Sequence, residues 1–312
     1  MNVWQIDFTL EGALGTPLRS NTLWGHLCWA VRHRDGEGAL ERWLTAQERE
    51  PLLLSDAFPR GWLPRPLLAP SPLAELPPAP TERLVRASRL KKLKRRAWLT
   101  AGDFAALQQG MSEARLLERW EACSKPDLEG TVTKRRARNS IDRRTGRTPD
   151  DGGLYFQDEV WYPGAGPHLW GFACAENLTA SELEDLLNAV GRSGYGRDAS
   201  TGRGRFRAAV REDSTGLFRH RGNRWMTLSR GTLSPGMRRP RYRLETHYGR
   251  LGGERAAAGS PFKHPLLLVA SGSTFAGDGG PHGELLRGVH PTLEDVRENA
   301  LHLCLPFTEV EP

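Results

Sequence analysis

The stretch that decides the fold is TASELEDLLNAVGRSGYGRDASTGRGRFRAAV (179–210), which reads as a helix, a glycine-rich loop and a strand in that order. Four apolar side chains recur at the spacing of one helical face: Leu183, Leu186, Leu187 and Val190. Thr179 and Glu182 have the spacing of a capping box, which predicts where this helix begins. The strand is expected at Phe206–Val210.

A strand and a helix are predicted at the other end of the chain. Apolar and polar residues alternate from Trp4 to Leu10, which is typical of a strand. Ser20 is expected to cap the helix that follows. A short strand with a rigid, extended edge is predicted for LLLSDAFPRGWLPRP (52–66). A hairpin across PGAGP is predicted for LYFQDEVWY (154–162) and HLWGFACA (168–175).

Residues 71–150 differ in composition, with a proline-rich entry, two basic runs and a predicted helix near Asp103 to Trp120. We interpret them as an insertion. Without it, residues 1–215 have the order β, α, β, β, α, β, the split βαβ pattern of a ferredoxin-like domain as in RNA-recognition motifs, with the glycine-rich loop at 191–205. Residues 216–312 are predicted to repeat this α+β fold.

The predicted repeat rests on four segments. RYRLETH (241–247) and HPLLLVA (264–270) read as strands, PTLEDVREN (291–299) as a helix that starts at proline, and ALHLCLPF (300–307) as the last strand.

Charge predicts a polyanionic partner. The 312 residues hold 44 Lys and Arg against 37 Asp and Glu, a net charge of +7. The cations cluster in ERLVRASRLKKLKRR (82–96), in KRRARNSIDRRTGR (134–147) and in the glycine-rich loop. One such run is usually solvated surface, but three in one chain favour a phosphate backbone as partner.

Other classes of function are disfavoured. The four cysteines, Cys28, Cys123, Cys174 and Cys304, show no zinc-ligand spacing, and we expect no metal or cofactor. The glycine-rich loop lies after a helix and before a strand, so it matches neither a dinucleotide fingerprint nor a P-loop, although its amides can cradle phosphates. Signatures of metal-dependent or triad catalysis, signal peptides and membrane spans are missing from the sequence, which predicts a cytoplasmic protein and leaves open a metal-independent ribonuclease.

Several segments resemble one family. SNTLWGHLCWA (20–30), LLSDAFPRGWLPRP (53–66), RRARNSIDRRTGRTPDDGGLYFQDEVWY (135–162) and GYGRDASTGRGRF (194–206) are similar, in order, to the fourth subunit of the type III-A CRISPR Csm complex, a RAMP protein. NRWMTLS (223–229), THYGRLGG (246–253) and SPFKHPLLLVASGSTF (260–275) extend the resemblance. Asn21 stands where this family usually has Asp.

The resemblance implies a noncatalytic subunit that caps the 5′ handle of the crRNA. It further implies a β-hairpin thumb inside 71–150 that distorts the guide–target duplex, and contacts to the large palm-domain subunit and the adjacent backbone RAMP subunit. The target RNA would be contacted only indirectly. It implies these RNA-binding residues: Ser20, Asn21, Lys134, Arg135, Arg138, Asn139, Arg143, Arg144, Gly194, Gly196, Ser200, Gly202, Arg203, Gly204 and Arg205. Ile141 is the candidate wedge of the thumb, and Asp142 is expected to form a salt bridge with a neighbouring arginine.

Two alternatives stay open. A RAMP endoribonuclease that processes precursor crRNA could use His26 or His33 as general base, although His26 lies in an apolar helix where a packed histidine is more common. A backbone RAMP subunit that cleaves target RNA would need self-assembly into a filament.

Overall fold

The computed structural model describes residues 2–71, 77–122, 131–257, 259–278 and 280–310. Its N-terminal half is built around one antiparallel sheet. The order of this sheet is β2-β8-β1-β9, and β3 pairs with the far end of β8. The strands are β1 Val3–Leu10, β2 Leu53–Leu54, β3 Phe58–Pro59, β8 Leu169–Cys174 and β9 Phe206–Glu212. Along residues 1–215, the strands of this sheet and the helices that pack on it follow one another as strand, two helices, two short strands, strand, helix and strand.

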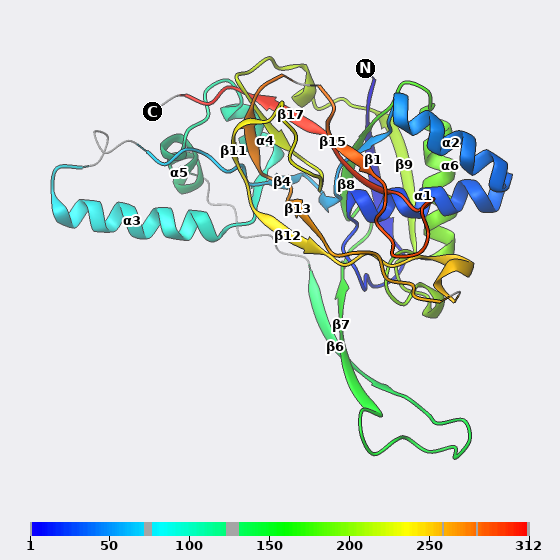
Figure 1. The fold of residues 1–312 in the computed structure, drawn as a ribbon. Helices are drawn as coiled ribbons and strands as arrows, with labels where there is room; N and C mark the ends of the chain where they lie inside the picture. Colours follow the sequence, from blue (N-terminus) through cyan, green and yellow to red (C-terminus); the bar gives the residue numbers. More distant parts are fainter. Residues whose placement is uncertain (1, 72–76, 123–130, 258, 279, 311–312) are drawn as a thin grey trace.

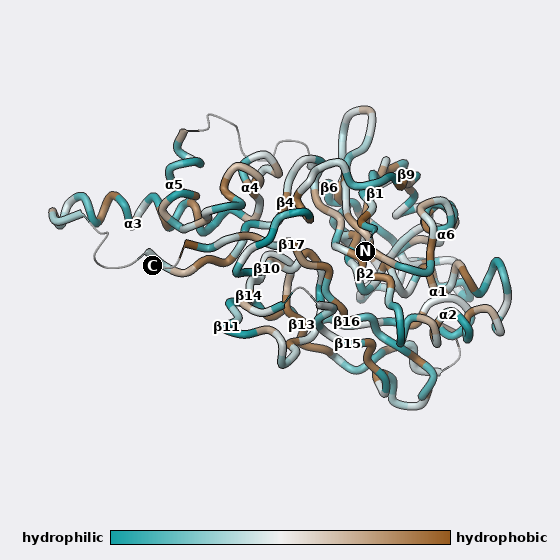
Figure 2. The backbone as a smooth tube through the Cα atoms, turned by 90° about the horizontal axis from the view of Figure 1, so that it is seen from above, coloured by the Kyte–Doolittle hydropathy of each residue, from teal (hydrophilic) through white to brown (hydrophobic). Residues whose placement is uncertain are grey.

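Both faces of this sheet are covered (Figure 1). One face packs on α1 (Ser20–Asp35) and α6 (Ala180–Ser193), while α2 (Glu37–Arg49) packs on α1. On β8, Leu169 and Ala173 join the core under these helices, whereas Trp170 and Phe172 point into a second core shared with the C-terminal strands. Because successive residues of a strand face opposite sides, β8 belongs to two cores at once. Figure 2 shows hydrophobic stretches concentrated in the central strands.

The two helices differ in how they begin. The capping box of α6 is present as predicted, with the Glu182 amide donating to Thr179 and the Glu182 carboxylate accepting from the Thr179 amide. The prediction that Ser20 caps α1 is wrong: Arg19 precedes the helix without a side-chain cap, and Ser20 is its first residue. The Ser20 amide donates instead to Asp56 Oδ1 at 2.9 Å, so a buried carboxylate from another segment satisfies this helix end.

The insertion contains more elements than predicted. They are α3 Pro80–Arg95, β5 Trp98–Thr100, α4 Ala101–Leu107, α5 Glu113–Ala122 and β6 Val132–Asn139, and β5 pairs with β4 (Trp62–Pro64), which precedes the insertion. The single helix expected from Asp103 to Trp120 is two helices, because the chain turns at Gly110 and Met111 then pairs with Glu309 of the C-terminal segment. Thr100 caps α4 by accepting from the Asp103 amide.

The predicted hairpin partner of residues 154–162 is wrong. β7 (Leu154–Trp161) pairs over its whole length with β6, not with β8. The reason is that both edges of β8 are occupied, by β1 on one side and by β2 and β3 on the other. The insertion therefore extends past residue 150, and the β6–β7 hairpin projects away from the rest of the protein (Figure 1).

The C-terminal half is a set of antiparallel strands. They are β10 Arg224–Thr227, β11 Arg238–Arg241, β12 Leu244–His247, β13 Leu266–Val269, β14 Thr274–Ala276, β15 His282–Leu286, β16 Glu298–His302 and β17 Cys304–Phe307. Sheet β11-β14-β10-β17 is the largest, and β12-β13 and β15-β16 are two-stranded. Short 3₁₀ turns lie at Ala199–Thr201, Leu217–Arg219 and Gly253–Ala256. The strand expected at 241–247 is split between two sheets, and the last strand breaks at Leu303.

The helix predicted at 291–299 is absent: residues 291–297 form bends and turns, and β16 begins at Glu298. His290 Nδ1 accepts from the amides of Thr292 and Leu293 as a helix cap would, but Val296 is drawn into a small cluster with Val289 and Leu251. Local capping is therefore overridden by tertiary packing.

A buried charge network joins the N-terminal and C-terminal halves. Glu298 accepts from Asn21 Nδ2 at 2.8 Å and from Lys263 Nζ at 2.5 Å, and His247 Nε2 lies 3.3 Å away. Burial acts to raise the pKa of Glu298, but the hydrogen bond from His247 and the charge of Lys263 outweigh it and lower the pKa to about 2. The carboxylate is therefore ionised and holds α1 against the C-terminal strands.

Candidate nucleic-acid interface

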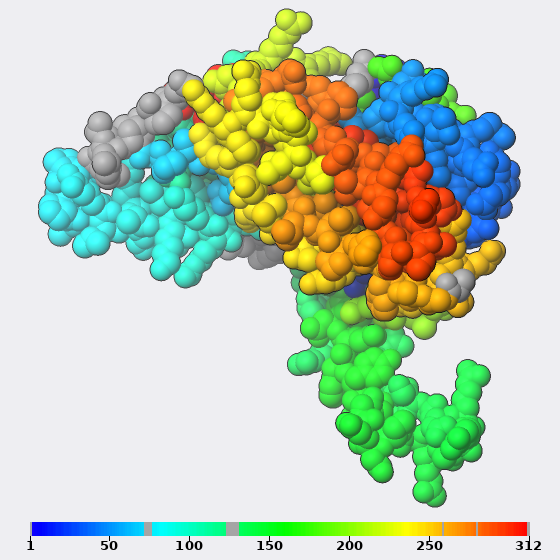
Figure 3. Space-filling view, viewed as in Figure 1, coloured from blue at the N-terminus to red at the C-terminus, as the bar shows by residue number. Residues whose placement is uncertain are grey.

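The β6–β7 hairpin exposes cations along its length. Lys134, Arg135, Arg143 and Arg144 are all exposed, and Figure 3 shows the hairpin standing clear of the protein. Cross-strand contacts hold it: Arg135 lies 5.5 Å over the Phe156 ring and 3.8 Å from Asp158, and Lys134 lies 5.6 Å over the Trp161 ring. A two-stranded hairpin is marginal by itself, so these contacts and its root must stabilise it.

The root of the hairpin lies against the glycine-rich loop. Leu14 and Val160 exchange two backbone hydrogen bonds, at 3.0 and 3.2 Å. Glu159 is buried and forms ion pairs with Arg203 of the loop and with Arg136 of β6. Two segments that the sequence analysis selected separately are thus brought together, and a buried ion pair fixes the direction of the hairpin.

The tip of the hairpin is the mostly exposed loop between Asn139 and Leu154 (Figure 1). Asn139 Nδ2 donates to Thr148 Oγ1 at 2.8 Å, and Asp142 Oδ1 accepts from the Arg144 amide at 2.8 Å. The expectation of a salt bridge at Asp142 is therefore replaced by a bond to a backbone amide. Ile141 is 62% exposed, which leaves an apolar side chain in solvent at the far end. The Arg138 guanidinium is half-buried, and its Nε has no hydrogen-bond partner.

The glycine-rich loop does not present its glycine amides. Gly194 donates to Val190 O, Gly196 to His26 Nε2, Gly202 to Ala199 O and Gly204 to Ala13 O. The expectation that these amides face phosphates is wrong for this conformation, because each already has an acceptor within the protein. All four have positive φ, and a Cβ at Gly204 would collide with the backbone of Tyr195. These glycines are needed for the path of the chain.

Tyr195 explains why the loop is so tightly wound. Its side chain is fully buried, and its hydroxyl donates to Pro17 O and accepts from the Arg19 amide, each at 3.0 Å. The loop is therefore tied to the start of α1. Arg203 is buried at 6% exposure beside Glu159 and Asp198, so it is a structural cation rather than a surface one. Ser200 and Arg205 are exposed on the same loop.

The structure places Ser20 and Asn21 in the interior. Ser20 is 4% exposed and its hydroxyl accepts from the Arg230 amide, while Asn21 is 2% exposed and bound to Glu298. Neither side chain reaches the surface that the hairpin and loop form. The replacement of Asp by Asn at position 21 fits this setting, because an amide donates to the buried carboxylate where a second carboxylate would repel it.

His26 beside the loop is a neutral histidine. Burial lowers the pKa of His26 to about 4, and its Nε2 is occupied by the Gly196 amide. His33 is exposed at the end of α1, 5.5 Å from the Trp29 ring. Burial raises the pKa of Cys174 to about 11; Cys123 lies outside the described residues. Within the residues that the structure describes, no cluster of His, Cys, Asp or Glu could hold a metal ion, and no helix is long and apolar enough to cross a membrane.

Sequence reasoning missed one surface. Five exposed apolar side chains gather on and beside the β12–β13 sheet: Tyr242, Leu244, Tyr248, Phe262 and Leu267. Leu267 lies opposite Thr246, so it shares the solvent face with Leu244. The alternation of RYRLETHY (241–248) could have indicated a strand with an apolar outer face. Segments 240–270 form much of the face in Figure 3.

Solved structures share this fold. No protein-family model matches the chain, and no curated protein matches it. A chain of a Csm1-Csm4 cassette crystallised with cA4 has a TM-score of 0.64 at 18% identity, and one crystallised with pppApA has 0.63 at 18%; each match covers 100% of both chains. A chain of a Csm3-Csm4 subcomplex of the type III-A CRISPR-Cas interference complex has 0.57 at 12%, over 98% of this chain and 99% of that one.

This chain has a Csm4-like RAMP fold. Csm4 is the subunit that both kinds of complex have in common, and the resemblance expected from the sequence is confirmed at the level of the fold. The Csm4-like fold includes the described part of the insertion, because the matches extend over essentially the whole chain.

Proposed function

We propose that the chain is the noncatalytic, guide-capping RAMP subunit of a type III-A CRISPR effector complex and binds the 5′ handle of the crRNA. The observation that carries the proposal is the exposed cationic hairpin, rooted against the glycine-rich loop in a Csm4-like fold. Lys134, Arg135, Arg143 and Arg144 supply phosphate contacts, with Ser200 and Arg205 at the root. Base pairing between the guide RNA and its target then supplies the sequence specificity, and the protein contacts the sugar–phosphate backbone of the RNA.

The first domain of this subunit is ferredoxin-like. Its sheet has the order β2-β8-β1-β9, in which the first strand along the chain lies between the third and the fourth. That connectivity, with α1 and α6 on one face, supports the assignment for residues 1–215. Residues 216–312 form the second domain by sequence, but their described part consists of strands and 3₁₀ turns, so we assign it an antiparallel sheet rather than a full ferredoxin-like repeat.

The β6–β7 hairpin is the thumb in this proposal. Ile141 stands 62% exposed at its tip, among the cations of residues 143–147. An apolar side chain in that position can wedge between bases while neighbouring arginines hold the displaced phosphates. The thumb would thereby distort the guide–target duplex and contact the target RNA indirectly.

The protein partners are the large palm-domain subunit and an adjacent backbone RAMP subunit. Csm1 and Csm3 occupy these roles beside Csm4 in the solved complexes. We propose that the large subunit docks on the exposed apolar face of β12–β13, because a stable complex of two proteins needs an interface with an apolar centre. Tyr242 and Tyr248 on that face are of the residue type that interfaces favour. A cytoplasmic location suits the free thiols of Cys28, Cys174 and Cys304.

The absence of catalysis is part of the proposal. A general base must reach its substrate, and His26 is enclosed, hydrogen-bonded to Gly196 and neutral with a pKa of about 4. The endoribonuclease alternative therefore depends on His33 alone of the two candidates. Incubation of the purified protein with a repeat RNA in buffer with EDTA tests it: a cut product that His33→Ala abolishes would overturn the noncatalytic assignment.

The decisive experiment is purification by a tag on this chain, co-expressed with neighbouring subunits and a repeat–spacer array. We expect co-purification of the large subunit, and bound RNAs that share one 5′ end derived from the repeat. Random RNA, or a chain that purifies alone, would contradict the capping assignment. Leu244→Asp with Leu267→Asp should release the large subunit and keep the RNA, whereas Leu154→Asp, which is equally exposed on the hairpin, should keep the large subunit.

The hairpin assignment has its own test. Arg143→Glu with Arg144→Glu should weaken RNA binding and lower the dependence of affinity on salt, because each lost phosphate contact reduces the slope by about 0.7 for single strands. Both side chains are exposed, so the protein's fold should be intact by circular dichroism. An unchanged affinity and slope would show that this tip does not contact RNA.

A further inference from the structure

Helix α3 is a second cationic element, and it projects from a different side of the protein than the hairpin (Figure 1). Leu93 is the single buried side chain among its 16 residues. Cations occur around its whole circumference, so it has no apolar stripe that would require burial against another surface. The proposed function, which uses the hairpin and the glycine-rich loop, does not involve this helix.

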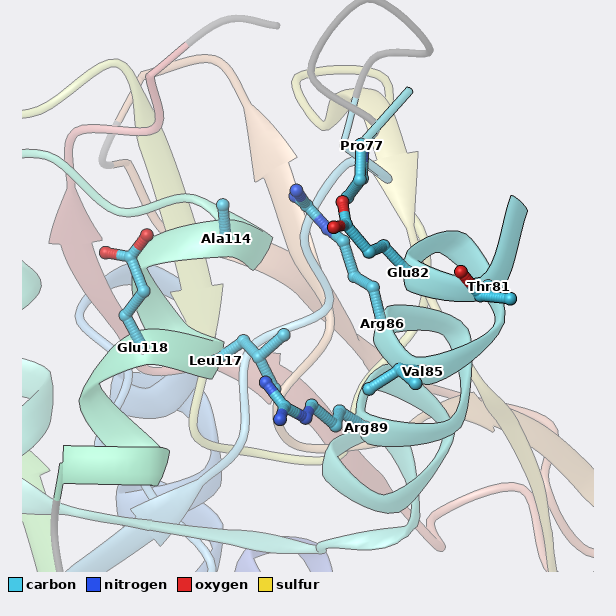
Figure 4. Close-up of a pocket in the computed structure, with 9 residues that line it drawn as sticks. All are labelled: Pro77, Thr81, Glu82, Val85, Arg86, Arg89, Ala114, Leu117 and Glu118. Carbon is cyan, nitrogen blue, oxygen red and sulfur yellow. The ribbon is translucent and has the colours of Figure 1, made fainter. Parts of the chain in front are cut away.

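The inner side of α3 faces α5 across a cleft of about 450 Å³. Figure 4 shows Arg86 and Arg89 on the side of α3 that borders this cleft, opposite Leu117 of α5. Arg89 lies 3.4 Å from Glu121, and Arg86 donates to Ser71 Oγ at 3.3 Å. The cations on this side are therefore engaged within the protein.

The outer side of α3 is different. At 3.6 residues per turn, Lys91 and Arg95 fall on the side opposite Arg86, Arg89 and Leu93, and Lys92 lies on the flank next to them. All three are exposed, and within the described ranges none of them has an ion pair or a side-chain hydrogen bond. Their mutual repulsion is left for solvent ions or a ligand to relieve.

The end of α3 that carries these cations is held rigidly. Arg65 Nε donates to the Arg96 carbonyl at 3.0 Å, and its Nη2 donates to the Lys94 carbonyl at 3.3 Å. The Lys94 ammonium also pairs with the buried Glu113 of α5 at 2.6 Å. Because the helix end is fixed before any ligand arrives, little order has to be gained on binding.

We propose that Lys91, Lys92 and Arg95 form a second binding site, for the phosphodiester backbone of a single-stranded nucleic acid. A polyanion relieves the repulsion and releases counterions on binding. An acidic protein surface is the other occupant with the right charge, but protein interfaces are depleted in lysine, and two of these three residues are lysine. The site adds to the proposed function by extending the nucleic-acid path to α3, and it rests on that function only for the class of ligand.

The test measures the affinity of the full-length protein for a labelled single-stranded RNA of arbitrary sequence over a series of salt concentrations. The variant is Lys91→Gln with Lys92→Gln and Arg95→Gln. The matched control is Arg34→Gln with Arg42→Gln and Arg49→Gln, which removes the same charge from three exposed helical arginines on α1 and α2. We expect the log–log salt slope to fall by about 2 in the variant, at about 0.7 per lost contact, and to change far less in the control.

The outcomes separate the two proposals. Equal slopes for the α3 variant and its control would overturn the α3 site, whatever Arg143→Glu with Arg144→Glu does at the hairpin. Loss of slope at α3 alone would keep this site and contradict the hairpin assignment. If the α3 variant retains RNA binding but loses a protein subunit from the complex, the ligand is an acidic protein and the proposal is wrong. Parallel measurements with single-stranded DNA and duplex RNA identify which phosphodiester the site prefers.

Discussion

The glycine-rich loop and the β6–β7 hairpin are both rich in arginine, but they differ in whether their polar groups are already paired within the protein. Arg203 of the loop is 6% exposed and paired with Glu159, and the amides of Gly194, Gly196, Gly202 and Gly204 all donate within the protein. Arg143 and Arg144 of the hairpin are exposed, and no ion pair involves them among the described residues. The loop therefore fixes the position of the hairpin, while the hairpin exposes the groups that a nucleic acid can contact.

The largest effect is expected at the centre of the loop. Gly204→Ala should prevent folding or destabilise the protein by about 4 kcal/mol, because φ is +66° and the added Cβ would collide with the Tyr195 backbone. Gly202→Ala is the matched control, since φ is +85° but the space around it is open; it should cost about 1 kcal/mol. Urea unfolding measures both, and equal losses would contradict the steric explanation.

Arg203→Ala should cause the next largest loss in the free energy of unfolding. It leaves Glu159, at 2% exposure, with the more distant Arg136 as its partner, and breaking a buried pair costs about 3 kcal/mol. Arg205→Ala, two residues away and exposed, should change the free energy of unfolding by less than about 0.5 kcal/mol. If Arg203→Ala is as mild as Arg205→Ala, the root of the hairpin does not depend on this ion pair.

Stability should fall with acid because two buried histidines are neutral in the folded protein. Burial lowers the pKa of both His26 and His302 to about 4, whereas the unfolded chain binds protons from about pH 6.5 downward. Protonation therefore favours the unfolded chain, and each histidine should remove about 2 kcal/mol between pH 7.5 and pH 5. The pKa of Glu298 is lowered to about 2, so the stability that this carboxylate contributes is lost only as the pH falls below about 4.5.

Chemical unfolding at a series of pH values measures this loss. His26→Gln should flatten the curve between pH 7.5 and pH 5 by about half, since His302 continues to titrate. His33→Gln is the control, because His33 is exposed. A curve for His26→Gln that is parallel to the wild-type curve would mean that the pKa of His26 is the same in the folded and unfolded protein.

One local signal in the sequence was reliable, whereas the local signals at Ser20 and Pro291 and the choices of strand partner were not. The capping box at Thr179 and Glu182 predicted α6 because both groups lie within one helical turn. The partner of residues 154–161 could not be predicted from neighbouring segments, since it depends on which edges of β8 are free after the whole sheet has formed. The loop amides were expected to cradle phosphates, but those of Gly204 and Gly196 donate to Ala13 and His26, which are far away in sequence.

The smallest effect on stability, and the sharpest test of the thumb, is expected at Ile141. Its side chain is 62% exposed, so Ile141→Ser should change the free energy of unfolding by less than about 0.5 kcal/mol. If the thumb parts guide from target, a 2-aminopurine placed at successive target positions should fluoresce at one of them in the assembled complex, because it is unstacked there. Ile141→Ser should quench that signal, whereas Val132→Ser, exposed at the other end of β6, should leave it. Undiminished fluorescence in Ile141→Ser would assign the unstacking to another element, and the hairpin would then act through its cations alone.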